Sequence, residues 1–187
     1  MIISNISVPL LGLVDTAILG HLDSPAYLSA VAIGVSLLSF LYWGFAFLRM
    51  GTTGLAAQYY GAQNFNRVKQ VLLQSALLGC VIGLCLIGLS HWLIPLGLQL
   101  MAPPEGSYTL SQQYVSIRIL SAPAVLITFA VIGCLIGQQN TRLPLLIVVA
   151  TNALNILLDF FLIIGLGMNS AGAAWATVIA EYSGCAL

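Results

Sequence analysis

The chain has 187 residues, of which 60% are hydrophobic and only 5% are charged, and its formal net charge is zero. A soluble domain carries about 25% charged residues, so this composition excludes a globular fold with a water-exposed surface. The mean hydropathy of +1.04 agrees, and the balanced charge gives no indication of a nucleic-acid partner. The sequence therefore predicts an all-α, polytopic integral membrane protein.

Six apolar stretches are long enough to cross a bilayer, which takes about 20 residues per helix. They predict a six-helix transmembrane bundle, with helices over residues 1–22, 27–57, 68–100, 109–138, 143–166 and 170–187. In the third stretch, Pro95 and Gly97 favour an end of the helix near Trp92. Because both ends of the chain lack a flanking segment, we expect it to be part of a longer protein.

Basic residues are unevenly distributed between alternate loops. Arg67 and Lys69 lie where the loop after the second stretch meets the third, and Arg142 lies between the fourth and fifth. The loops after the first, third and fifth stretches contain no Lys or Arg. The positive-inside rule then places the two basic loops and the N-terminus in the cytoplasm.

Polar residues from three of the stretches are expected at one depth. Counted at 1.5 Å per residue, Asp15, Asp159 and Thr177 each lie about 10 Å below the outer ends of their helices. Asn152, Asn155 and Asp159 follow one another at i, i+3 and i+7, on one helix face. A carboxylate in mid-bilayer costs roughly 2.5–3.5 kcal/mol, so such residues face a bundle interior or a wet cavity.

Two acids, an amide and a hydroxyl together suit a coupling ion. A protonated Asp is neutral and tolerated, whereas an ionised one in a low-dielectric site needs a cation or water. The same oxygens could hold H⁺ or Na⁺, whereas hydrogen bonding between helices is the alternative role. Arg118 is a counter-ion to an acid or it snorkels outward. Glu181 lies one turn below Thr177 and is a candidate for proton or substrate handling.

Three segments resemble a known family of transporters. They read "NISVPLLGLVDTAILGHL", "RMGTTGLAAQYYGA" and "GQQNTRLPLLIVVATNALNILLDFFLIIGLGMNSAGAAWATVIAEY". They are similar to the multidrug and toxic compound extrusion (MATE) transporters, most of all to the bacterial DinF-type branch. The resemblance covers essentially the whole chain.

The resemblance implies a twelve-helix fold of two six-helix lobes, of which residues 1–187 are the N-terminal lobe. A C-terminal six-helix lobe, absent from this chain, is then the expected partner. The family's cation site, for H⁺ or Na⁺, is matched by Asp15, Asn155, Asp159 and Thr177, with a backbone carbonyl near Ala173. The family's bending proline would fall before Met1, and Pro9 is a separate candidate for a kink in the first helix.

The expected function is secondary antiport in a bacterial cytoplasmic membrane. The lobe would take part in multidrug efflux, the export of organic xenobiotic compounds in exchange for H⁺ or Na⁺, with no enzymatic activity and no cofactor besides the coupling ion. One alternative is a lipid or oligosaccharide flippase, which would favour a basic cavity. An intramembrane aspartyl protease using Asp15 and Asp159 lacks the GxGD context that such enzymes have. A non-transporting fragment is the remaining alternative, and the substrate and the ion stay open.

Overall fold

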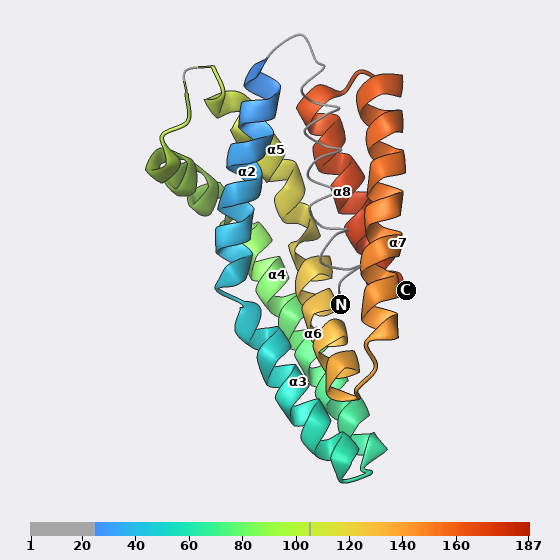
Figure 1. The fold of residues 1–187 in the computed structure, drawn as a ribbon. Coiled ribbons are helices and arrows are strands. Elements are labelled where there is room, and N and C mark those ends of the chain that lie inside the picture. The colour runs from blue at the N-terminus through green and yellow to red at the C-terminus, as the bar shows by residue number, and fades with distance from the viewer. Residues whose placement is uncertain (1–24, 105) are drawn as a thin grey trace.

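The computed structural model describes residues 25–104 and 106–187, and all regular structure in these ranges is helical. Figure 1 shows long helices running side by side in one bundle. In chain order they are α2 Pro25–Trp43, α3 Ala46–Gly61, α4 Phe65–Met101, α5 Tyr108–Arg118, η1 Ile119–Ser121, α6 Ala122–Gly137, α7 Arg142–Asp159, η2 Phe160–Gly165 and α8 Asn169–Ala186. The all-α prediction is confirmed, whereas the first expected helix lies outside the described residues.

Two expected helices are interrupted. The stretch 27–57 is divided into α2 and α3 at Gly44 and Phe45, where the backbone N–H of Phe45 donates to the carbonyl of Tyr42 at 2.9 Å. The stretch 109–138 is divided into α5 and α6 by the single 3₁₀ turn η1. Pro123 explains the second break, because its ring lacks an N–H and clashes with the carbonyl four residues earlier.

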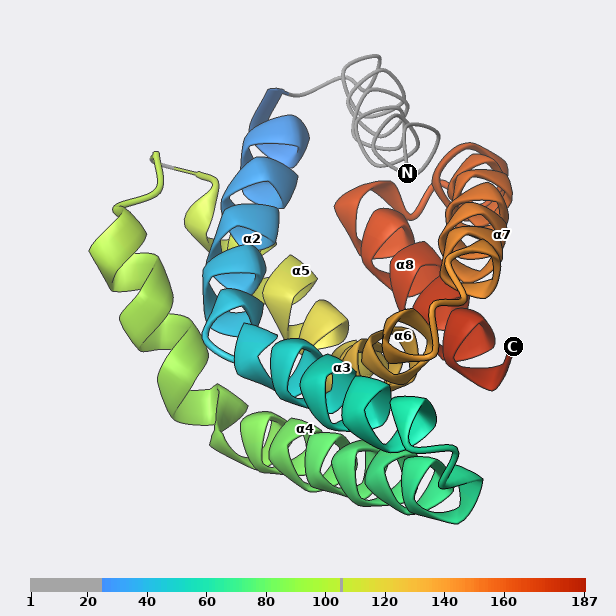
Figure 2. The same ribbon diagram turned by 60° about the horizontal axis from the view of Figure 1, so that its bottom comes forward.

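The expected end of a helix near Trp92 is wrong. Helix α4 continues through Pro95 to Met101, over 37 residues. At 1.5 Å per residue it is about 55 Å long, well beyond the roughly 30 Å of a hydrocarbon core. Figure 2 shows that its last part turns away from the line of its first part. The proline therefore bends this helix without ending it.

Helix α6 is packed closely between α3 and α4. Its own glycines face α3, and a glycine of α4 faces it on the other side. A Cβ added at Gly133 or Gly137 would lie 2.6 Å and 2.7 Å from the carbonyl oxygens of Arg49 and Thr53 on α3. On the other face, a Cβ at Gly83 of α4 would meet the Cα of Pro123 at 2.5 Å. Such small-residue contacts let helices approach closely in a bilayer, where the hydrophobic effect does not drive association.

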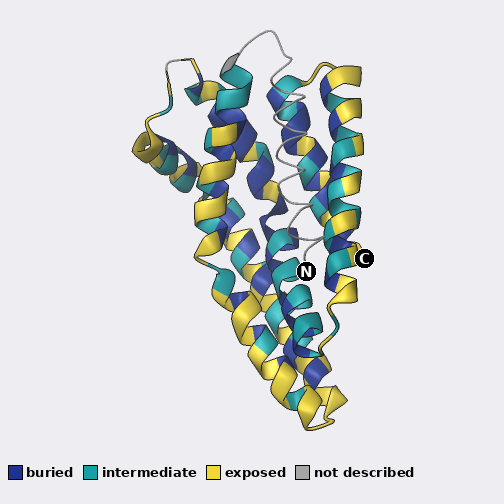
Figure 3. Cartoon of the chain, viewed as in Figure 1, coloured by how far each residue is buried: buried dark blue, intermediate teal, exposed yellow. Residues whose placement is uncertain are grey.

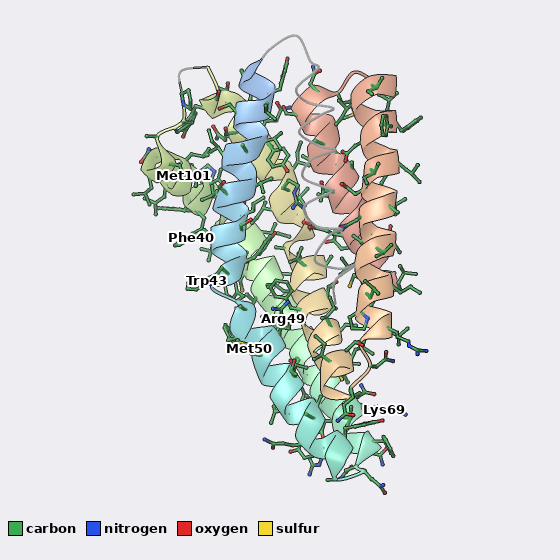
Figure 4. All side chains as sticks on the ribbon, in the orientation of Figure 1. Phe40, Trp43, Arg49, Met50, Lys69 and Met101 are labelled. Carbon is green, nitrogen blue, oxygen red and sulfur yellow. The ribbon has the colours of Figure 1, made fainter. Side chains whose placement is uncertain are left out.

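The outer surface of the bundle is apolar. Trp43 and Trp92 are each 77% exposed, and many other large hydrophobic side chains are exposed as well. Figure 3 shows exposed residues along the outward faces of the helices. Figure 4 shows Phe40, Trp43 and Met101 at the edge of the bundle. Four helices of the described part are long and apolar enough to cross a membrane: 26–43, 65–101, 108–137 and 142–165. The chain is therefore a multi-pass membrane protein whose apolar surface faces lipid.

Candidate functional site

Helix α7 turns its only two fully buried polar side chains toward α8. Asn155 and Asp159 are each 1% exposed, while Leu157 and Phe160 on other faces of the span are 67% and 51% exposed. A spacing of four residues places the amide one helix turn from the carboxylate, on the same helix face. Helix α8 lies against this face (Figures 1 and 2), and Gly172 and Ala173 of α8 are buried in the contact region.

Asn155 links the two helices. With its Nδ2 toward Asp159, it donates to Oδ2 of the carboxylate at 3.1 Å, and its Oδ1 accepts from the hydroxyl and the backbone N–H of Thr177, both at 3.1 Å. We assign this amide orientation from the hydrogen bonds, since it satisfies both ends of the side chain. The Thr177 hydroxyl also lies 2.9 Å from the carbonyl oxygen of Ala173, one turn back on α8.

The structure thus brings together four of the five residues predicted for the coupling-ion site. They supply a carboxylate, an amide oxygen, a hydroxyl and a backbone carbonyl, which are hard oxygen donors suited to a proton or an alkali cation. They are Asn155, Asp159, Thr177 and Ala173. The fifth, Asp15, and the candidate kink at Pro9 lie outside the described residues.

A change of helix type follows Asp159 directly. The chain continues from α7 into the π-helical segment η2, and the backbone N–H of Met168 closes the end by donating to the carbonyl of Leu162 at 3.1 Å. Gly172 lets α8 approach here, because a Cβ at this position would lie 3.1 Å from the backbone of Leu162. Single π-turns within helices are frequent at functional sites. No sequence pattern pointed to this segment.

Asn152 lies on the same helix but is not joined to the cluster. It is half-buried, and within the described part of the chain its Nδ2 is buried without a hydrogen-bond partner. The cluster therefore begins at Asn155 among the residues described.

The two remaining candidates, Arg118 and Glu181, pair with each other. Nη1 of Arg118 lies 2.8 Å from Oε2 of Glu181 and also donates to the hydroxyl of Ser121 at 3.1 Å. Both side chains are largely buried, so the guanidinium does not snorkel to the membrane surface. Of the two roles left open for Arg118, counter-ion to an acid is the one found, and that acid is Glu181.

The fold and this cluster define a polytopic helical membrane protein with ionisable groups buried between its spans, as in transporters that carry ions. The MatE family profile matches residues 1–161, and the chain belongs to this family of transporters. Membership confirms the resemblance drawn from the sequence, and it places the chain among transporters and not among enzymes.

Individual relatives agree. The chain is 49% identical over 183 residues to DNA damage-inducible protein F of Escherichia coli, which covers 98% of this chain and 40% of that protein. It is 30% identical over 195 residues to a probable multidrug resistance protein NorM of Thermotoga maritima, again over 98% of this chain and 40% of the relative. The chain therefore spans about 40% of the length of these relatives.

Among solved structures, a MOP superfamily transporter from Pyrococcus furiosus matches with a TM-score of 0.89 and 23% identity. The match covers 98% of this chain and 40% of that one. At this identity the match shows a shared fold.

Proposed function

We propose that this chain is the N-terminal, ion-coupling lobe of a secondary antiporter that exports organic compounds in exchange for H⁺ or Na⁺. The observation that carries the proposal is the buried carboxylate of Asp159, hydrogen-bonded to Asn155, which in turn binds Thr177 on the next helix. A carboxylate at this depth costs several kcal/mol in a bilayer. Binding of a transported ion is a function that would explain why the chain keeps it there. A C-terminal lobe would complete the transporter.

The two amide orientations of Asn155 suit two states of Asp159. An ionised carboxylate only accepts hydrogen bonds, so it requires Nδ2 toward it, as assigned above. A protonated carboxyl group donates, so it favours Oδ1 toward it. In that second orientation Nδ2 donates to the Thr177 hydroxyl at 3.1 Å, and the hydroxyl donates to the carbonyl of Ala173 at 2.9 Å. Uptake of a proton by Asp159 would then rearrange the contact between α7 and α8.

The orientation in the membrane follows from the basic residues. Arg67 and Lys69 begin α4 and Arg142 begins α7, and these two turns lie at the same end of the bundle in Figure 1. The positive-inside rule assigns this end to the cytoplasm and places Asp159 in the outer half of the bilayer. The bacterial relative favours the cytoplasmic membrane as the location.

The organic substrate is supported by the relatives. One of them is named a probable multidrug resistance protein. A flippase for anionic lipids would favour a basic cavity, whereas the buried guanidinium of Arg118 is neutralised by Glu181. An organic, often cationic, solute is therefore the better substrate class.

The test joins this chain to the remaining C-terminal part of the Escherichia coli relative, and we call the product the fused transporter. Efflux of a fluorescent organic cation from proteoliposomes is followed under an opposing gradient of H⁺ or of Na⁺. At least one gradient should accelerate efflux, and Asp159→Asn and Asp15→Asn should each abolish the acceleration while the protein still inserts. Acceleration at the unmodified rate in both variants would place the coupling site elsewhere.

A further inference from the structure

The span formed by α5 and α6 is broken within the bundle, and backbone carbonyls at the break accept hydrogen bonds from two sides. Within the span, the hydroxyl of Ser121 donates to the carbonyl of Arg118 at 2.8 Å. From α8, the hydroxyl of Tyr182 donates to the carbonyl of Leu120 at 2.9 Å. Carbonyls freed by a helix break need such partners in a bilayer, where water does not supply them.

The residue next to Tyr182 also binds this break. Glu181 forms its 2.8 Å ion pair with Arg118, the last residue of α5, and Arg118 in turn donates to Ser121 inside the 3₁₀ turn. Two consecutive residues of α8 thus bind the α5–α6 span at the break. Glu181 does so through an ion pair, and Tyr182 through a backbone carbonyl. Tyr182 and Glu181 lie 62 and 63 residues from their partners, so these bonds fix tertiary structure.

The same helix carries part of the coupling-ion site. Ala173, Thr177 and Glu181 are spaced by four residues, so each lies about 40° around α8 from the one before. Thr177 reaches Asn155 of α7 from this face, and Glu181, one turn further, reaches α5. Since a helix turn is stiff, the rotation and height of α8 at Glu181 determine where the Thr177 hydroxyl lies.

We propose that Arg118, Glu181 and Tyr182 form a clamp that positions α8, and through it Thr177 and the carbonyl of Ala173, in the coupling-ion site. The proposal rests on the function proposed above, and it makes these three residues positioning residues. The clamp connects the ion site to the break in the α5–α6 span, so a shift of α8 on ion binding acts on that break.

The clamp is tested by ion binding to the purified chain in lipid nanodiscs. Trp43 and Trp92 are replaced by Phe, so that Trp175, two residues before Thr177 on α8, becomes the reporter. Trp43 and Trp92 are largely exposed on the lipid-facing surface, so their replacement leaves the interior intact. The emission of Trp175 is recorded during titration with NaCl and, separately, with acid.

Two variants separate positioning from simple stability. A single replacement of Arg118 or Glu181 would leave one buried charge unpaired and could unfold the chain, so Arg118→Met and Glu181→Gln are combined. Tyr182→Phe removes one hydroxyl and keeps the ring. For both variants we expect at most a small drop in melting temperature but roughly 2- to 12-fold weaker ion binding, the equivalent of one hydrogen bond.

The outcomes are distinct. Ion binding as tight as in the unmodified chain, in both variants, would overturn the clamp and leave the proposed function standing. If the unmodified chain responds to neither ion, the coupling site itself is overturned, and the clamp with it. Should the double variant melt early, the result for Tyr182→Phe decides, since that change leaves every charge paired.

Discussion

Replacing Thr177 by valine removes one hydroxyl from the coupling-ion cluster and keeps the shape of the side chain. The hydroxyl lies 3.1 Å from the side-chain amide of Asn155 and 2.9 Å from the carbonyl of Ala173. Thr177→Ser is the matched control, because it keeps the hydroxyl and loses only a methyl group. Thr177 is half-buried and Asn155 is fully buried, so water cannot freely replace the lost contact at the amide.

The expected cost follows from that burial. A buried polar group that loses its partner costs about 1–3 kcal/mol. If the hydroxyl also serves as an oxygen ligand, the same loss appears in ion affinity, as a change of about 5- to 150-fold. Because the backbone N–H of Thr177 still reaches the amide of Asn155 at 3.1 Å, we expect values nearer the lower end of this range.

The assay is the ion concentration that gives half-maximal efflux by the fused transporter in proteoliposomes. Thr177→Val should raise this concentration by that factor for whichever ion drives efflux, while Thr177→Ser stays close to the unmodified protein. The maximal rate at saturating ion should change less than the half-maximal concentration. Equal values for the valine and serine variants would refute the assignment of the hydroxyl to the ion site.

Two further predictions concern topology and packing. Single cysteines at Pro104 and Met168, in a background without other cysteines, should react with a membrane-impermeant reagent on intact cells, whereas one at Asn66 should react only after permeabilisation; the opposite pattern would reverse the proposed orientation. Gly83→Ala should lower the melting temperature of the chain, because its Cβ meets Pro123 at 2.5 Å. The matched control Gly88→Ala, which has nothing within 4 Å, should leave the melting temperature unchanged or raise it slightly.

The residues of the ion cluster could be predicted from the sequence, because the free-energy cost of a polar side chain in lipid depends on its own helix alone. An acid in an apolar stretch is unfavourable wherever it faces lipid, so Asp159 had to face inward. Helical periodicity then placed Asn155 on the same face. Matching depths brought Thr177 into the same group, although depth alone does not give hydrogen-bond partners.

The ion pair between Arg118 and Glu181, in contrast, could not be predicted from the sequence. Depth placed both residues within the membrane, and the spacing from Thr177 placed Glu181 on a known face of α8. Which acid meets the guanidinium depends on how α5 and α8 are rotated against each other, and no pattern within either helix determines this. The hydrogen bond from Tyr182 to the carbonyl of Leu120 at the α5–α6 break is non-local for the same reason.

Helix ends were predicted unevenly. Pro95 was expected to end a helix and only bends it, because a membrane helix tolerates an internal proline when the freed backbone groups find other partners. Pro123, in contrast, coincides with a real break. The glycine pairs Gly79–Gly83 and Gly133–Gly137 have the GxxxG spacing, yet the sequence does not show which helix each pair contacts.

The central claim is that Asp159 itself takes up the coupling ion, and infrared difference spectroscopy tests it most directly. Spectra of the purified chain in lipid are recorded before and after addition of acid, and before and after addition of Na⁺. For at least one ion we predict a change in the carboxyl or carboxylate stretching bands that is missing from the Asp159→Asn variant. Identical difference spectra for the two proteins, with both ions, would contradict the claim.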